Sequence, residues 1–233
     1  MPIPNLVPHR PSPPHRHPHG FTLVELLVAL AALSLLAMMG WRGLDAMVRT
    51  QEQTSARTSQ WLVLQTALAQ WGTDLDAMLS LPYTTPLDWD GQVLRLTRRS
   101  SAPVDEGAIV VAWTRRNVQG TEQWLRWQSG PVRTRAQWQQ VWQQAALWAR
   151  TPGDAERANQ TVLLPLAGWQ LFYYRGDAWS NPLSSSGAST DVEGSISVPD
   201  GIRLHLELPP SSGIAGPIVR DWAQPLQGGG KSQ

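Results

Sequence analysis

The stretch of sequence that decides the fold runs from Gly20 to Trp41 and reads GFTLVELLVALAALSLLAMMGW. It contains one charged residue, Glu25, and no proline. In helical form, about 20 apolar residues with a rise of 1.5 Å each cross a hydrocarbon core of roughly 30 Å. The next proline is Pro82, so the helix can continue beyond the membrane. We therefore expect a transmembrane helix over residues 21–41 that extends into water.

The residues before this stretch differ from it sharply. Residues 1–20 are rich in proline and histidine, and proline this dense prevents a helix. A secretory signal peptide has its small-residue cleavage site after the apolar run, whereas Gly20 lies before a run that is long enough to span. A simple signal anchor would give no reason for Glu25. The leader histidines could bind a transition metal, but a targeting leader is the simpler interpretation, and we predict no metal site.

Glu25 is the most informative residue of the apolar stretch. A carboxylate in a membrane helix costs about 2.5–3.5 kcal/mol at the centre and less near an end, so a partner is expected. If the chain is cut between Gly20 and Phe21, the new amino group of Phe21 on a neighbouring subunit could neutralise Glu25. Alternatively, Glu25 lies at the membrane interface and is stabilised by the dipole of the helix N-terminus. These residues alone leave both interpretations open.

Gly20–Glu25, followed by the apolar residues 26–30, resembles the processing motif of type IV prepilins and type II secretion pseudopilins. In that family a membrane aspartyl peptidase, the prepilin peptidase, cuts after the glycine and methylates the new amine. The resemblance implies cleavage between Gly20 and Phe21 and an assembly role for Glu25. It also implies a single-pass protein of the bacterial inner membrane with its C-terminal domain in the periplasm. Positive charges on both sides of the span do not decide this orientation by themselves.

After the membrane segment, the sequence predicts a helical extension over residues 42–80 that ends before Pro82 and Pro86. The second part of this extension has an apolar face with helical spacing, which should pack on the soluble domain. That face consists of Trp61, Leu64, Leu68, Trp71, Leu75 and Met78. We also expect many of the 13 tryptophans to lie at the edge of the core, because a buried indole N–H needs a partner.

Beyond Pro86 the apolar period changes to two, which is typical of half-buried strands. Strands are expected near 94–97, 109–113, 125–127, 161–166, 169–175, 201–208 and 218–222, and a helix over 134–150. The fold class is therefore α+β, with one long helix packed on antiparallel sheet and a β-rich domain over 81–226. Residues 180–200 indicate a surface loop, and residues 227–233 a disordered tail.

The order of elements resembles the J-type minor pseudopilins of type II secretion. The residues that carry this resemblance are Trp41–Asp45, Trp71 with Asp74-Leu75, Phe172–Arg175, Trp179, Val198-Pro199, Ile202–Leu204 and Val219-Arg220. It implies a place in the pseudopilus tip complex, where the protein would initiate assembly and support protein export. The implied partners are the I- and K-type minor pseudopilins and the major pseudopilin. A minor pilin of a type IV pilus or DNA-uptake machine is the alternative, since it shares the leader.

Catalytic and cofactor chemistry are not indicated by the sequence. There is no cysteine, no Gly-x-Ser-x-Gly elbow and no phosphate-cradling glycine loop, and His205 is the only histidine after the leader. We therefore predict that the protein is not an enzyme and has no cofactor, although a membrane-anchored enzyme remains a third hypothesis. The formal net charge of +1 gives no reason to expect nucleic acid as a partner.

Three carboxylate pairs and two arginine doublets are candidate binding sites. The pairs are Asp74 with Asp76, Asp88 with Asp90, and Asp105 with Glu106. Calcium needs six to eight oxygen ligands, and no pair supplies them, so a polar turn is the favoured interpretation of Asp88–Gly91. Arg98-Arg99 and Arg115-Arg116 are the only basic doublets, and a solvated strand edge is favoured over nucleic-acid binding for Arg115 and Arg116.

Overall fold

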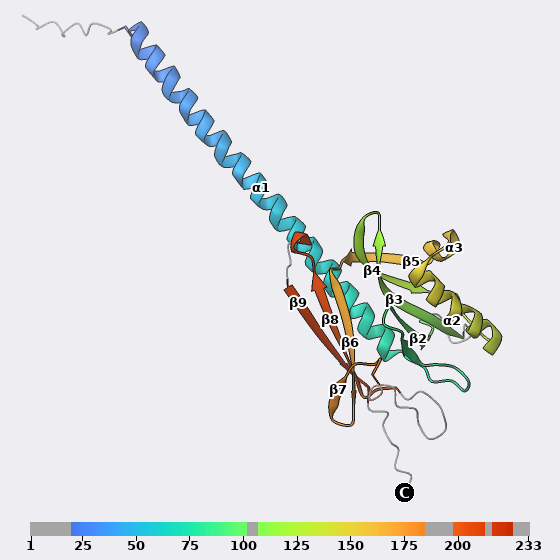
Figure 1. Ribbon diagram of the computed structural model, residues 1–233. Helices are drawn as coiled ribbons and strands as arrows, with labels where there is room; N and C mark the ends of the chain where they lie inside the picture. Colours follow the sequence, from blue (N-terminus) through green and yellow to red (C-terminus); the bar gives the residue numbers. More distant parts are fainter. Residues whose placement is uncertain (1–19, 102–106, 185–197, 213–215, 226–233) are drawn as a thin grey trace, which may run out of the picture. The chain divides into compact units, whose positions relative to one another are not determined.

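The computed structural model describes residues 20–101, 107–184, 198–212 and 216–225 (Figure 1). This part of the chain forms two compact units that divide between Glu52 and Gln53. The leader before Gly20, the pair Asp105 and Glu106, and the predicted tail over 227–233 lie outside the described residues.

One helix, α1, runs from Leu23 to Asp76 and contributes to both units. Every residue of α1 before Leu64 is exposed, so none of them belongs to the core of the described chain. From Leu64 onward, residues on one face are buried at spacings of three and four, as expected for an amphipathic helix. They are Leu64, Ala67, Trp71, Asp74 and Leu75.

The rest of the second unit consists of two antiparallel sheets and two further helices. The five-stranded sheet A contains β1 (Leu87–Trp89), β2 (Val93–Arg99), β3 (Ala108–Val118), β4 (Thr121–Gln128) and β5 (Gln160–Pro165), in that order. The four-stranded sheet B has the order β7 (Ala178–Ser180), β6 (Gly168–Arg175), β8 (Gly201–Leu208), β9 (Gly216–Ala223). The helices are α2 (Arg135–Arg150) and α3 (Asp154–Ala158), and a short 3-10 turn, Pro210–Ser212, precedes β9. The α+β prediction is confirmed.

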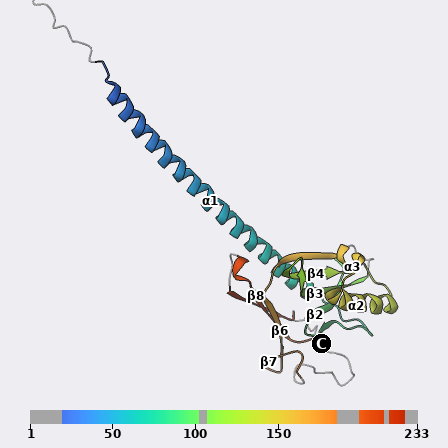
Figure 2. The same ribbon diagram turned by 45° about the horizontal axis from the view of Figure 1, so that its top comes forward.

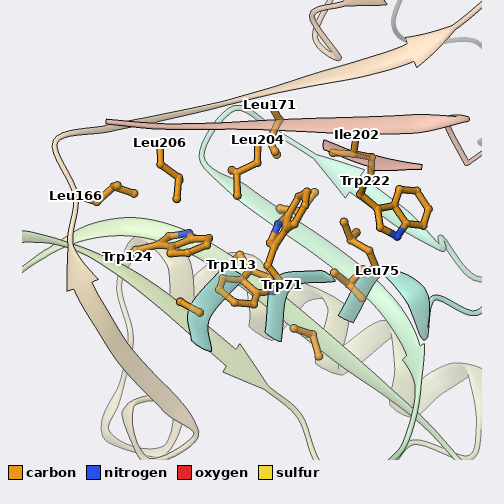
Figure 3. Packing of buried hydrophobic residues seen from close by; sticks show 14 of the residues in the cluster. Trp71, Leu75, Trp113, Trp124, Leu166, Leu171, Ile202, Leu204, Leu206 and Trp222 are labelled. Carbon is orange, nitrogen blue, oxygen red and sulfur yellow. The ribbon is translucent and has the colours of Figure 1, made fainter. Parts of the chain in front are cut away.

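Two hydrophobic clusters lie on opposite faces of sheet A. The larger cluster joins the buried face of α1 to sheet A and to the inner face of sheet B, and Figure 3 shows Trp71 between Trp113 and Trp124 of sheet A and Leu204 of sheet B. The second cluster joins the other face of sheet A to α2, which Figure 2 shows beside β2 and β3. Sheet A is therefore covered on both faces, which explains the continuous apolar run Ala108–Trp113 in its central strand β3.

Tryptophan supplies much of this core, and more deeply than the sequence analysis predicted. Five tryptophans are fully buried, namely Trp71, Trp113, Trp124, Trp127 and Trp148. Among the described residues, the indole N–H groups of Trp71, Trp124 and Trp127 have no hydrogen-bond partner, so the expected edge position is wrong for these three. Burying an indole removes 150–250 Å² from water, worth about 4–6 kcal/mol, which exceeds the roughly 1–3 kcal/mol cost of one unpaired group.

The C-terminal end of α1 also differs from the prediction. The helix ends at Asp76 rather than at residue 80, so Pro82 does not terminate it. The chain instead pairs with β2, because the carbonyl of Ala77 accepts from the N–H of Arg99 (2.9 Å) and the N–H of Leu79 donates to the carbonyl of Thr97 (2.9 Å). Trp61 is 49% exposed and therefore lies outside the core face to which its spacing assigned it.

A buried carboxylate joins α1 to three strands of sheet A. Asp74, fully inaccessible to solvent, accepts two hydrogen bonds from the guanidinium of Arg126 on β4 (2.7 and 2.9 Å) and one from Arg98 on β2. The indole N–H of Trp113 on β3 and the side-chain amide of Gln70 donate to it as well, each at 2.9 Å. Two cations and five hydrogen bonds compensate the charge, as a buried carboxylate requires.

The neighbouring carboxylate makes the corresponding contact with sheet B. Asp76 accepts a hydrogen bond from the indole N–H of Trp222 on β9 at 2.8 Å. Leu75, between the two aspartates, lies in the core. The last turn of α1 is thus bonded to both sheets, and the carboxylates that the sequence analysis weighed as a cation site are occupied by protein donors.

We predict that Asp74→Asn destabilises the protein by about 3–5 kcal/mol, because it leaves two buried guanidinium groups without a counter-charge. Urea unfolding followed by tryptophan fluorescence measures the change. Asp221→Asn is the matched control, because Asp221 forms a bidentate pair with Arg203 (2.7 Å) in which both side chains are partly exposed. Equal losses for the two variants would contradict the assigned role of Asp74.

We also predict a loss of stability above pH 10 that depends on Tyr173. Its hydroxyl is buried without a hydrogen-bond partner among the described residues, and burial, followed by the charge of Asp88, raises its pKa. Above a pH of about 10 the unfolded chain releases this proton first, so the free energy of unfolding falls by about 1.4 kcal/mol per pH unit.

Tyr173→Phe should remove this slope without loss of stability at neutral pH, since the deleted hydroxyl has no partner there. Tyr83→Phe, at a side chain that is 78% exposed, is the control and should keep the slope. Denaturant unfolding between pH 8 and pH 11 checks both expectations, and a slope that survives Tyr173→Phe would count against them.

Candidate assembly site

The predicted processing residues lie at the start of α1. Gly20, Phe21 and Thr22 precede the first helical residue and are all exposed, and the Phe21 side chain is 91% exposed. Among the described residues, apart from its neighbour in the chain, no group lies within 4 Å of the position that a Cβ atom on Gly20 would occupy. The Gly20–Phe21 bond thus joins two exposed residues and lies just outside the helix.

Glu25 closes a capping box with Thr22. The Oε2 atom of Glu25 accepts hydrogen bonds from the backbone N–H and the hydroxyl of Thr22, each at 2.9 Å. In return, the backbone N–H of Glu25 donates to the hydroxyl oxygen of Thr22 at 3.3 Å. This reciprocal pattern satisfies N–H groups that a helix N-terminus otherwise leaves open. The sequence analysis missed it, although Thr-x-x-Glu before an apolar run is its signature.

The capping box uses one of the two carboxylate oxygens of Glu25. Within the described part of the chain, Oε1 accepts no hydrogen bond. The only other polar side chain between Glu25 and Trp41 is that of Ser34, whose hydroxyl donates to the carbonyl of Leu30 at 2.7 Å. In a membrane helix the Glu25 carboxylate is therefore the side chain that still needs a partner.

The apolar segment of α1 is one candidate membrane span by length and composition. All of its residues are exposed in the described chain, including the large side chains of Leu26, Leu30, Leu33 and Leu36, each more than half exposed. An apolar helix surface of this extent needs a nonpolar environment, either lipid or other apolar helices.

The remaining sites that the sequence analysis weighed have structural roles. Asp88 pairs with Arg95, and Asp90 accepts hydrogen bonds from the backbone N–H groups of Gln92 (2.9 Å) and Val93 (2.8 Å). The polar turn lies at Asp90 and Gly91, as favoured, whereas Asp88 and Trp89 belong to strand β1 and pair with β2. No group of three or more potential metal ligands is found among the described residues.

The second arginine doublet is only partly as expected. Arg116 donates to the carbonyl of Trp148 (2.6 Å) and the side chain of Gln160 (2.9 Å), and Arg115 donates to the carbonyl of Ala167. Both arginines lie on β3 beyond Thr114, the last residue of β3 that pairs with β2, so only β4 pairs with them and their placement on a strand edge is correct. They are half-buried rather than fully solvated. Their guanidinium groups connect elements of the domain. His205 lies on the half-exposed outer face of sheet B, as predicted.

Comparison with known families agrees with this geometry. Residues 15–41 match the prokaryotic N-terminal methylation motif. The chain is therefore a prepilin-like protein, in which an apolar helix with this motif precedes a folded domain.

The part of the chain after the apolar segment identifies the family. Residues 42–215 match the family described as type II secretion system (T2SS), protein J. The chain belongs to this family of J-type pseudopilins, which is a structural family and not a family of enzymes. No curated protein matches the chain. The family match favours type II secretion over the pilus and DNA-uptake alternative, which shares only the N-terminal motif.

We predict that Thr22→Val speeds the amide hydrogen exchange of the first turn of α1, because valine lacks the capping hydroxyl. Thr22→Ser should leave this exchange unchanged, because serine keeps the hydroxyl. In detergent micelles, amide hydrogen exchange of residues 23–26 should rise about fivefold in the valine variant, the effect expected for loss of one cap. Unchanged exchange in Thr22→Val would show that the capping box does not stabilise the helix start.

Proposed function

We propose that the protein is a minor pseudopilin of the type II secretion pseudopilus tip. There it associates with the I- and K-type minor pseudopilins and the major pseudopilin, initiates assembly and supports protein export across the outer membrane. The observation that carries this proposal is an apolar helix, fully exposed in the single chain, that contains one incompletely bonded carboxylate. Such a helix is suited to lateral association in a membrane.

Processing supplies the partner that Glu25 lacks. We infer that prepilin peptidase cuts the exposed Gly20–Phe21 bond on the cytoplasmic side of the inner membrane and methylates the new amine. The domain from residue 42 onward then lies in the periplasm. The amino group of Phe21 on a neighbouring subunit neutralises Glu25, and the small residues Ala29 and Ala32 allow close approach of the helices. Pairing in lipid offsets the cost of the buried charge.

The capping box makes it possible to separate the two roles of Glu25. Glu25→Gln removes the charge but keeps an oxygen that can accept from Thr22, because glutamine serves in a capping box as well as glutamate does. Glu25→Ala removes both functions. We predict that both variants insert into the membrane and are cleaved, and that both lose at least about tenfold in association with sibling pseudopilins, equivalent to 1.4 kcal/mol or more.

Membrane fractionation, co-purification of the full-length chain with sibling pseudopilins, and export by a complemented deletion strain measure these effects. Thr22→Val is the control, because it removes the cap and keeps the charge. If Glu25→Gln assembled and secreted like the wild type while Thr22→Val did not, Glu25 would be a capping residue only, and the charge-pairing proposal would be wrong.

A further inference from the structure

The four sheet edges differ in their protection against added strands. An edge strand presents unpaired N–H and C=O groups, which proteins guard by shortness, charge, proline or bulges. β1 and β7 contain three residues each. β9 carries Pro217, Arg220 and Asp221. β5 contains six residues and no charged side chain, and its proline, Pro165, comes last. β5 is therefore the longest described edge strand without a charged side chain.

The first half of β5 has regular geometry for pairing. The carbonyl of Asn159, just before the strand, accepts from the N–H of Gln128 (3.3 Å) and so points to β4. By antiparallel alternation, the N–H and C=O groups of Gln160 and Val162 point away from β4. The register shift begins directly after Val162, because Leu125 pairs with Val162 and Trp124 with Leu164, so Leu163 is unpaired and the regular part of this edge is Gln160–Val162. Val162 is 46% exposed.

An apolar pocket of about 180 Å³ lies beside the second half of β5. Its walls come from β5 itself, from α1 and from the end of β8, and none of its lining residues is charged. The lining residues are Ser59, Gln60, Val63, Leu64, Leu163, Leu164, Pro165, Leu208 and Ser212. An apolar cavity of about 150 Å³ holds a benzene ring. This pocket therefore has room for one aliphatic or aromatic side chain.

The α1 wall of the pocket is part of a larger apolar surface. Trp61, Leu62 and Val63 are successive residues of α1 and are 49%, 58% and 42% exposed. Three successive helical residues point in directions about 100° apart, so the fold of one chain cannot cover all of them with a single face. Exposed apolar surface next to an open pocket indicates a protein contact.

We propose that β5 and this pocket form a docking site for an extended, uncharged segment of a neighbouring pseudopilin. The segment adds a strand along Gln160–Val162 and inserts one apolar side chain between Val63 and Leu163. Strand addition of this kind takes affinity from main-chain hydrogen bonds and specificity from the pocket. The proposal rests on the proposed function for the identity of the partner, since the pocket wall belongs to the same helix that associates with sibling subunits.

Photocrosslinking of the full-length chain in secretion-competent cells tests the site. p-Benzoylphenylalanine is placed at Val63 or Thr161, and at Gln139, an exposed residue of α2, as the control. We expect an adduct with another pseudopilin from positions 63 and 161 and none from 139. An adduct with a second copy of this chain, with an exported protein or with the chain's own Ile214, which follows Ser212 outside the described residues, would overturn the proposal. So would the absence of any adduct.

Substitutions test the contact independently. Val63→Glu places a charge in the pocket, and Val162→Pro removes an outward N–H at a position where an edge strand tolerates proline. With the probe at Thr161, each substitution should lower the recovery of the crosslinked sibling at least about tenfold. Cleavage, membrane insertion and thermal stability should stay near their wild-type values. Leu147→Glu, at a side chain of α2 that is 64% exposed, is the matched apolar-to-acid control and should change nothing.

The two proposals fail in different ways. If Glu25→Gln abolishes association but Val63→Glu and Val162→Pro leave the adduct intact, the docking site is wrong and the proposed function stands. If none of the three variants changes association with siblings or export, the proposed function is wrong as well.

Discussion

The fold depends on the burial of one carboxylate at the end of a helix. Asp74 has no access to solvent, and its charge is compensated by guanidinium groups from β2 and β4 and by an indole N–H from β3. A charge in this position is costly unless every donor is in place, so it fixes the rotation of α1 on sheet A. The bond from Trp222 to Asp76 fixes the same turn on sheet B. Together these contacts place the buried face of α1, including Trp71, in the core.

The same helix carries two kinds of surface along its length. Before Leu64 all of its residues are exposed, and from Leu64 onward one of its faces is part of the domain core. A second carboxylate, Glu25, lies near the other end of α1, where Thr22 satisfies one of its oxygens. Asp74 is satisfied entirely within its own chain, whereas one oxygen of Glu25 accepts no hydrogen bond from the described residues. This difference is the physical basis for assigning stability to one end of the helix and association to the other.

Local patterns predicted much of this structure, and long-range contacts account for what they missed. The alternation of Ile202, Leu204, Leu206 and Leu208 predicted β8 with the bounds that the structure has. The role of Asp74 could not be predicted, because its partner Arg126 is 52 positions away and no local pattern links them. The end of α1 was misplaced for the same reason, since pairing with β2 ends the helix before the proline. At Glu25 the sequence indicated a role in association but not the capping box with Thr22.

The central claim is that α1 becomes an assembly helix when a new amino terminus is made near Glu25. Mass spectrometry of the intact protein and of its N-terminal peptide, after purification from the membrane, tests this claim most directly. The account predicts a mature polypeptide that begins at Phe21 with a methylated amino group. A polypeptide that keeps its first 20 residues, or that begins at any other residue, would contradict it.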